Sequence, residues 1–231
     1  PESWRDTAAR LQGPIVARAQ SVFAQHWMEE TGEPLTGGGV FPPLEPAGST
    51  TAHLVSSSPR GGVSSVSILY RYVIAAARRE ILIQNPYFCP GHEAIGLLVA
   101  AARRGVEIRI MLPGRHTDSP VARHAGHRHY ARLLAAGIEI WEHEVTVPHQ
   151  KVVVVDRVWS HIGSTNFDPR SFDINAEVSL GVLGPEIADE LKAAFEDDLE
   201  GAERITAPAW ARRPRSCRIA DRLAFLVHEQ L

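Results

Sequence analysis

Apolar positions change their period repeatedly after Val66, and this alternation predicts an α/β fold. Residues with helical spacing follow Val66, whereas "KVVVVD" is apolar on both faces, as expected of a central strand. Gly105 and Gly137 end two predicted helices, and Pro185 begins a third. We therefore expect a β-sheet covered by helices on both faces. The predicted strands are "EILIQNPYF", "VEIRIMLP", "IEIWEH", "KVVVVD" and "AEVSLGVLG".

Residues 34–48, "PLTGGGVFPPLEPAG", interrupt this pattern. They contain four prolines and four glycines in fifteen residues, a composition typical of a linker or a long loop. The linker separates a short structured piece, residues 1–33, from a larger C-terminal domain, residues 49–231.

The N-terminal piece resembles a later part of the same chain. "RDTAARLQGPIVARAQSVFAQHW" and "AEVSLGVLGPEIADELKAAFEDDL" each contain an acidic residue, a strand, Gly-Pro, a helix and a Phe. Because strand-Gly-Pro-helix is common in α/β proteins, chance similarity is the alternative. A true repeat would make residues 1–33 the end of a first repeat and residues 49–231 a complete second one. The matched positions are Asp6 with Glu177, Gly13-Pro14 with Gly184-Pro185, and Phe23 with Phe195.

Candidate chemistry lies in "HQKVVVVDRVWSHIGSTN", residues 149–166. Residues i and i+2 of a strand share a face, so His149 and Lys151 should project together while Gln150 points away. Ser164 and Asn166 follow in a compact turn and can present short polar groups to the same place. The pattern is H-x-K-x4-D-x6-G-S-x-N, with Asp156 at its centre.

These residue types suit displacement at phosphorus. An imidazole can attack phosphorus or protonate a leaving alkoxide, and its pKa lies near working pH. The ammonium of Lys151 can neutralise phosphate, while Ser164 and Asn166 offer neutral donors for oxygens on which charge builds.

At these residues the sequence resembles the phospholipase D superfamily, and "GSTNFDPRSFDINAE", "NPYFCPG" and "WRDTAARLQGP" resemble its cardiolipin synthase branch. The resemblance implies a mixed sheet and a phosphatidyltransferase that moves a phosphatidyl group between phosphatidylglycerol molecules through a phosphohistidine. It assigns His149 and Lys151 to catalysis and gives Asp156 a structural part in the catalytic motif. It implies neither a metal nor a cofactor.

Further residues receive expected roles beside that motif. We expect Ser164 and Asn166 to bind substrate phosphate and Glu177 to orient a histidine through its second ring nitrogen. Tyr87 and Phe88 should line the pocket or pack beneath it. Arg170 should help shape the pocket, in a loop and paired with a carboxylate.

One histidine cannot be both nucleophile and acid for the same bond, and the family solves this with two facing motifs. Only one such motif occurs here. We expect the missing motif to come from upstream sequence, with His149 as general acid/base; a homodimer partner is the alternative. A lipid hydrolase, a nuclease or an inactive remnant are the competing functions.

Composition narrows the candidate partners. A formal net charge of −3 gives no reason to expect specific nucleic-acid binding, and two cysteines, Cys89 and Cys217, are too few for a disulfide framework. No apolar run is long enough to span a membrane within residues 1–231. We expect an anionic phospholipid substrate and a peripheral location on the cytoplasmic side of the cytoplasmic membrane.

Two basic stretches remain. The helix around residues 115–129 is rich in His and Arg, and we expect it to present a solvated face, with head-group contact or metal binding as weaker alternatives. The C-terminal "WARRPRSCRIADR" places arginines beside Trp210, which suits an anionic membrane surface or a solvated tail. The first stretch contains Arg115, His116, Arg123, His124, His127, Arg128 and His129; the second contains Arg212, Arg213, Arg215, Arg218 and Arg222.

Overall fold

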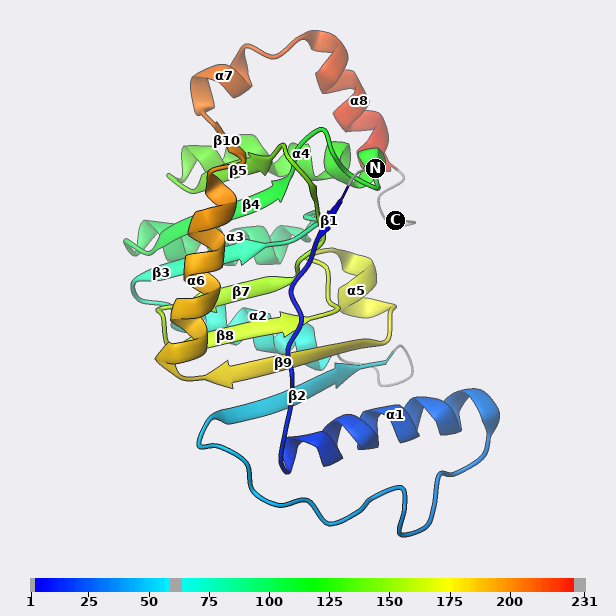
Figure 1. Ribbon diagram of the computed structural model, residues 1–231. Coiled ribbons are helices and arrows are strands. Elements are labelled where there is room, and N and C mark those ends of the chain that lie inside the picture. The colour runs from blue at the N-terminus through cyan, green and yellow to red at the C-terminus, as the bar shows by residue number, and fades with distance from the viewer. Residues whose placement is uncertain (1–2, 59–63, 227–231) are drawn as a thin grey trace.

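The computed structural model describes residues 3–58 and 64–226, which form an eight-stranded mixed sheet with helices on both faces (Figure 1). The predicted fold class is therefore confirmed. The strand order is β10-β5-β4-β3-β7-β8-β9-β2. The strands are β2 (Thr51–Ser57), β3 (Glu80–Gln84), β4 (Glu107–Pro113), β5 (Glu139–His143), β7 (Val152–Val155), β8 (Trp159–Gly163), β9 (Glu177–Leu183) and β10 (Ala202–Ile205).

Strand direction follows the connections. β3, β4 and β5 are parallel because a helix returns the chain across the sheet between them, through α3 (His92–Arg103) and α4 (Pro120–Ala135). β7, β8 and β9 follow one another antiparallel, and β7 pairs antiparallel with β3. The carboxyl ends of β3 and β4 therefore lie at the same end of the sheet as the start of β7.

The four valines of β7 show how the sheet buries both faces. Val153 and Val155 belong to the cluster beneath α3, α4 and α2 (Ser65–Ala76), whereas Val152 and Val154 pack with α6 (Pro185–Leu199). Figure 1 shows α6 alone in front of the sheet and the other three helices behind it. This two-sided burial explains why "VVVV" is continuously apolar.

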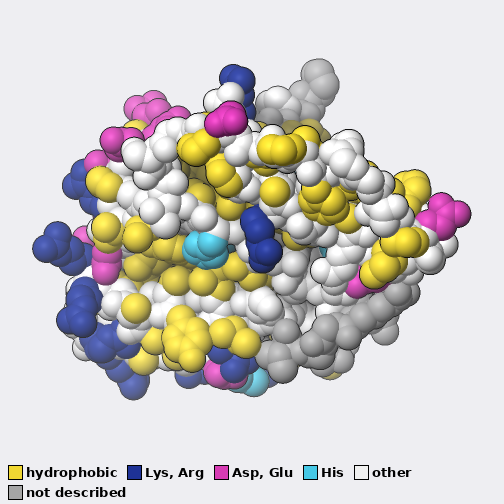
Figure 2. All heavy atoms as spheres, turned by 90° about the horizontal axis from the view of Figure 1, so that it is seen from below, with side chains coloured by type: hydrophobic (Ala, Val, Ile, Leu, Met, Phe, Trp, Pro, Cys, Tyr) yellow, Lys and Arg dark blue, Asp and Glu magenta, His cyan; other side chains and the backbone are white. Residues whose placement is uncertain are grey.

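Residues 3–31 lie outside the main sheet. β1 (Trp4–Arg5) pairs in parallel with β6 (Val147–Pro148), and α1 (Ile15–Thr31) runs beside β2 (Figure 1). Residues 34–48 contain no helix or strand. None of the residues of α1 is buried, and Phe23 and Trp27 are 56% and 40% exposed. Figure 2 looks at the molecule from this end and shows hydrophobic side chains gathered on its surface.

Local structure departs from the predicted pattern in several places. The repeat alignment expected a strand between Asp6 and Gly13, but these residues form none. Strands β2, β8 and β10 were not predicted. The strand expected over "HQKVVVVD" begins only at Val152, because pairing with β1 ends at Pro148 and pairing with β3 and β8 begins at Val152. His149 and Lys151 therefore lie in the connection between two strands. Three helices were not predicted: α5 (Pro169–Asp173), α7 (Ala207–Ala211) and α8 (Arg215–Leu226).

Candidate active site

His149 stands at the edge of the sheet with a carboxylate on one ring nitrogen. Its backbone N–H donates to Arg5 O at 2.7 Å, and its Nδ1 lies 3.2 Å from Asp6 Oδ2. Because a carboxylate only accepts, the imidazole donates from Nδ1 in this contact. The edge of the Trp4 ring lies against the imidazole, which keeps 31% of its side chain exposed. The ring is thus oriented and still reachable.

Lys151 brings a buried ammonium to the same imidazole. Its Nζ donates to His149 O at 2.8 Å and lies 2.9 Å from Nε2 of that ring, so the two side chains meet as predicted. Burial lowers the pKa of Lys151 to about 8, although Asp6, Asp118 and other carboxylates favour its charged form. The site therefore holds a cation that loses its proton far below the usual range for lysine.

Asp198 fixes the segment that carries these two residues. Its carboxylate accepts from Arg5 Nε, Gln84 Nε2 and Gln150 Nε2, each at 2.9 Å. Gln150 thus points away from the site, as its place between His149 and Lys151 predicts. A single carboxylate on α6 joins the N-terminal strand, β3 and the connection before β7. Sequence reasoning missed this role, because the partners of Asp198 are far from it along the chain.

The "GSTN" turn lies beside Lys151, since Gly163 N donates to Lys151 O at 3.2 Å. A Cβ at Gly163 would lie 2.7 Å from Val178 O, so this approach to β9 requires glycine. Ser164 Oγ accepts from Val178 N at 3.0 Å and donates to Glu177. Among the described residues, Asn166 Oδ1 is buried without a hydrogen-bond partner.

Glu177 does not hold His149. Its carboxylate accepts from Ser164 Oγ and from Asn175 Nδ2, the latter at 3.3 Å. The carboxylate that orients His149 is Asp6, the residue that matches Glu177 in the repeat alignment. Sequence reasoning expected a carboxylate to orient a histidine and named Glu177. The carboxylate that contacts His149 is that of Asp6.

Asp156 lies at the far end of β7 from Lys151. With φ of 55°, it turns its carboxylate toward the start of β3, where it accepts backbone N–H groups of Arg78, Arg79 and Glu80. These bonds tie the β7–β8 turn to β3. The geometry suits a structural part in the motif and does not bring Asp156 to His149.

The predicted pocket residues divide between rim and core. Tyr87 is half-buried and donates from its hydroxyl to Asp118, whereas Phe88 is 3% exposed and stacks on Phe167. Asn85 Oδ1 joins the two loops by accepting from Tyr87 N at 3.2 Å and Phe167 N at 3.1 Å. Arg170 is exposed on α5. Asn85 is a positioning residue that sequence reasoning missed.

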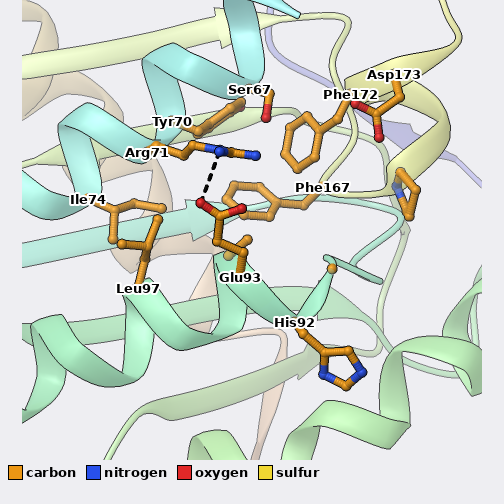
Figure 3. A pocket seen from close by; sticks show the side chains of 13 residues that line it. Ser67, Tyr70, Arg71, Ile74, His92, Glu93, Leu97, Phe167, Phe172 and Asp173 are labelled. Carbon is orange, nitrogen blue, oxygen red and sulfur yellow. Dashed lines mark ion pairs between the residues drawn. The ribbon is translucent and has the colours of Figure 1, made fainter. Parts of the chain in front are cut away.

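A separate cavity of about 170 Å³ lies behind this loop, between α2, α3 and α5 (Figure 3). Phe167 and Phe172 line its floor, and Arg71 pairs with Glu93 at 2.9 Å beside it. None of the predicted site residues lines it. The backbone of Phe167 thus lies in the loop beside the site, and its ring packs in the core behind that loop.

The His/Arg-rich helix α4 is not a solvated face, contrary to expectation. His127 and His129 are each 6% exposed. His127 lies between two carboxylates, Glu142 Oε1 at 3.2 Å and Asp221 Oδ1 at 2.9 Å, and His124 also reaches Asp221 at 2.9 Å. These partners lie 15 and 94 residues away from His127, so the helical pattern alone could not reveal them.

The two cysteines lie in different environments. Cys89 is buried and Cys217 is partly exposed, and both are free thiols. Burial raises the pKa of Cys89 to about 12, so this thiol stays protonated beside the site.

Comparison with known proteins identifies relatives for most of the chain. Residues 70–199 match the family described as "Cardiolipin synthase, PLD-like domain". Cardiolipin synthase 1 of Staphylococcus epidermidis is 32% identical over 97% of this chain and 46% of its own length. Cardiolipin synthase of Geobacillus kaustophilus is 33% identical over 97% of this chain and 45% of its own length. The chain thus spans about half the length of the curated relatives it matches.

Solved structures share the fold at lower identity. The phospholipase D family member Nuc of Salmonella typhimurium superposes with a TM-score of 0.57 at 23% identity, over 68% of this chain and 99% of Nuc. Phosphatidylserine synthase of Haemophilus influenzae gives a TM-score of 0.56 at 14% identity, over 88% of this chain and 52% of its own.

Proposed function

Because the chain belongs to the cardiolipin synthase branch of the phospholipase D superfamily, a superfamily of enzymes, we propose that it forms one half of a phosphatidyltransferase site. The substrate we infer is phosphatidylglycerol, which would serve as both donor and acceptor. The observation that carries the proposal is the His149 imidazole, held by Asp6 on one nitrogen and beside the Lys151 ammonium.

His149 acts as the general acid and base in the proposed mechanism. A complementary histidine attacks the phosphorus of phosphatidylglycerol, an N–P bond forms, and the P–O bond to glycerol breaks. His149, protonated on Nε2, gives that proton to the departing glycerol oxygen. It then takes a proton from a second phosphatidylglycerol hydroxyl, whose oxygen attacks phosphorus as the N–P bond breaks. Lys151 and Asn166 hold the phosphoryl oxygens as charge builds.

We propose that the complementary histidine belongs to a preceding repeat. Asp6 and Glu177 occupy matched positions, and Asp6 serves the histidine of the other repeat unit, namely His149. By the same symmetry Glu177 would serve the complementary histidine. The exposed Phe23 of α1 matches Phe195 of α6, which is 1% exposed against the sheet, so α1 would cover the sheet of that preceding repeat.

Transfer of labelled phosphatidyl groups tests this proposal in the chain extended through the preceding repeat. His149→Ala should reduce formation of radioactive cardiolipin from labelled phosphatidylglycerol more than about 100-fold, the usual range for loss of a general acid and base. His92→Ala, which changes an exposed histidine beside the Figure 3 cavity, is the matched control and should retain activity. Retention of more than a tenth of the activity by His149→Ala contradicts the assignment.

The same assay separates the competing functions. Release of phosphatidic acid in place of cardiolipin from labelled phosphatidylglycerol would indicate a hydrolase. Cardiolipin formation by the 231-residue chain alone, sedimenting as a dimer, would replace the preceding repeat with a second copy as the source of the complementary histidine.

A further inference from the structure

Helix α8 presents three different faces. Asp221 is its buried residue, turned toward α4. On the exposed side, Ile219, Leu223 and Leu226 follow helical spacing and are 57%, 61% and 78% exposed. Arg215, Arg218 and Arg222 are also exposed and flank that apolar row. A helix with basic residues beside an exposed apolar row has the composition of an interfacial membrane helix.

The basic charge continues into a hollow between α4, α7 and α8. This hollow has a volume of about 490 Å³, and its lining includes Arg128, Arg213, Arg218 and Arg222. From Ala207 to Leu226 the chain carries five arginines and one acidic residue, although its net charge is −3. Asp221 is that acid, and Arg213 pairs with it at 3.0 Å. The exposed cations thus face solvent without acidic neighbours from their own segment.

Asp221 also holds α8 in place. Burial alone would raise the pKa of Asp221, but hydrogen bonds from His127 and His124 hold it at about 2. The carboxylate therefore stays charged at any working pH and ties α8 to α4. Phe225 adds a second tie, because the Arg128 guanidinium lies 3.9 Å from its ring centroid. The apolar row and the arginines therefore lie on a helix that is held against α4.

Helices α4 and α8 lie at the end of the sheet where the candidate active site opens. α4 begins two residues after Asp118, whose carboxylate accepts from Tyr87 and acts on Lys151. α8 contacts α4 in its first two turns, at His124 and His127. In Figure 1, α7 and α8 lie at the end of the molecule opposite α1, so this surface is separate from the one we assign to the preceding repeat.

From these observations we propose that α8 docks on the surface of an anionic phospholipid bilayer. Ile219, Leu223 and Leu226 enter the interface between head groups and acyl chains, and the arginines bind lipid phosphates. The choice of a bilayer over a protein rests on charge complementarity with anionic lipid and, through the proposed function, on a substrate that resides in a bilayer. Docking here brings the active-site edge of the sheet to its substrate.

Vesicle flotation tests the docking directly. The 231-residue chain should float with vesicles of 30% phosphatidylglycerol in phosphatidylcholine and remain unbound with pure phosphatidylcholine. Arg215→Gln/Arg218→Gln/Arg222→Gln should lower the partition coefficient on the order of a hundredfold, about fivefold for each arginine. Ile219→Gln/Leu223→Gln should lower it by at least about tenfold. Both variants should keep the melting temperature of the parent, because all five side chains are exposed.

A matched triple variant controls for total charge. Arg78→Gln/Arg79→Gln/Arg103→Gln removes three exposed arginines from the opposite edge of the sheet and should leave binding within twofold of the parent. Equal loss in both triple variants would overturn the proposal, because binding would then follow net charge alone. A dimer that dissociates in Ile219→Gln/Leu223→Gln would also overturn it by assigning the apolar row to a second copy.

Failure of the docking proposal and failure of the proposed function give different results. His149→Ala should float with vesicles as the parent does, since docking needs no catalysis. Cardiolipin synthesis with vesicle binding unchanged by every α8 variant would refute the docking and leave the function standing. Normal docking by the chain extended through the preceding repeat, without transfer, would refute the function and leave the docking standing.

Discussion

Replacing Asp198 with Ala should destabilise the fold and the active site together. The substitution removes the acceptor for Gln84 and Gln150, which are 4% and 2% exposed, so two buried amide donors lose their partner. Each unsatisfied donor costs about 1–3 kcal/mol. The ion pair to Arg5, whose side chain is 41% exposed, adds less than about 1 kcal/mol. We expect a loss of about 2–6 kcal/mol in the free energy of unfolding.

Urea denaturation followed by far-ultraviolet circular dichroism measures this loss. Asp189→Ala is the matched control, because its ion pair with Arg157 joins side chains that are 46% and 55% exposed and should contribute little to stability. A second variant, Asp198→Leu with Gln84→Leu and Gln150→Leu, removes donors and acceptor together and should recover much of the stability. A change below about 0.5 kcal/mol for Asp198→Ala would refute the assignment of this carboxylate as the clamp.

Three further changes address the site itself. Asp6→Asn should lower phosphatidyl transfer about 10- to 100-fold with an unchanged melting temperature, because it removes the charge at His149 Nδ1 while keeping the shape; a normal rate would contradict its orienting role. Sulfate binding by calorimetry should weaken about tenfold per pH unit above 8, as Lys151, whose folded pKa is about 8, loses its proton; constant affinity up to pH 10 would exclude Lys151 as the anion-binding charge. Gly163→Ala should cost more than about 2 kcal/mol in urea denaturation, because its Cβ would meet backbone 2.7 Å away; Gly96→Ala, inside α3 with open space around it, is the control and should stabilise by about 0.5–1 kcal/mol.

Local patterns in the sequence predict much of the fold. The period of apolar residues reports which faces are buried, and β7, with valines packed on both faces, is the clearest case. The pairing of His149 with Lys151 is also local, since they are two positions apart. The spacing predicted that the two side chains would meet, although β7 begins only at Val152. In the connection before β7, His149 and Lys151 still contact each other while Gln150 points away.

Contacts between distant residues could not be predicted in this way. Asp6 and His149 are 143 positions apart, and the only signal for Asp6 was its match with Glu177. His127 looks solvent-facing in a run of histidines and arginines, yet Glu142 and Asp221 bury it. A charged group can be buried only where other elements supply its partners, so the residue pattern of one helix does not predict its burial.

The pairing of β1 with β6 has a consequence for the order in which the protein assembles. β1 receives its strand partner only after more than a hundred further residues have left the ribosome. Until then His149 has no oriented ring, and contacts of such large sequence separation form slowly. A nascent chain would therefore carry the motif for some time before Asp6 oriented its imidazole, because that contact needs the two distant segments to meet.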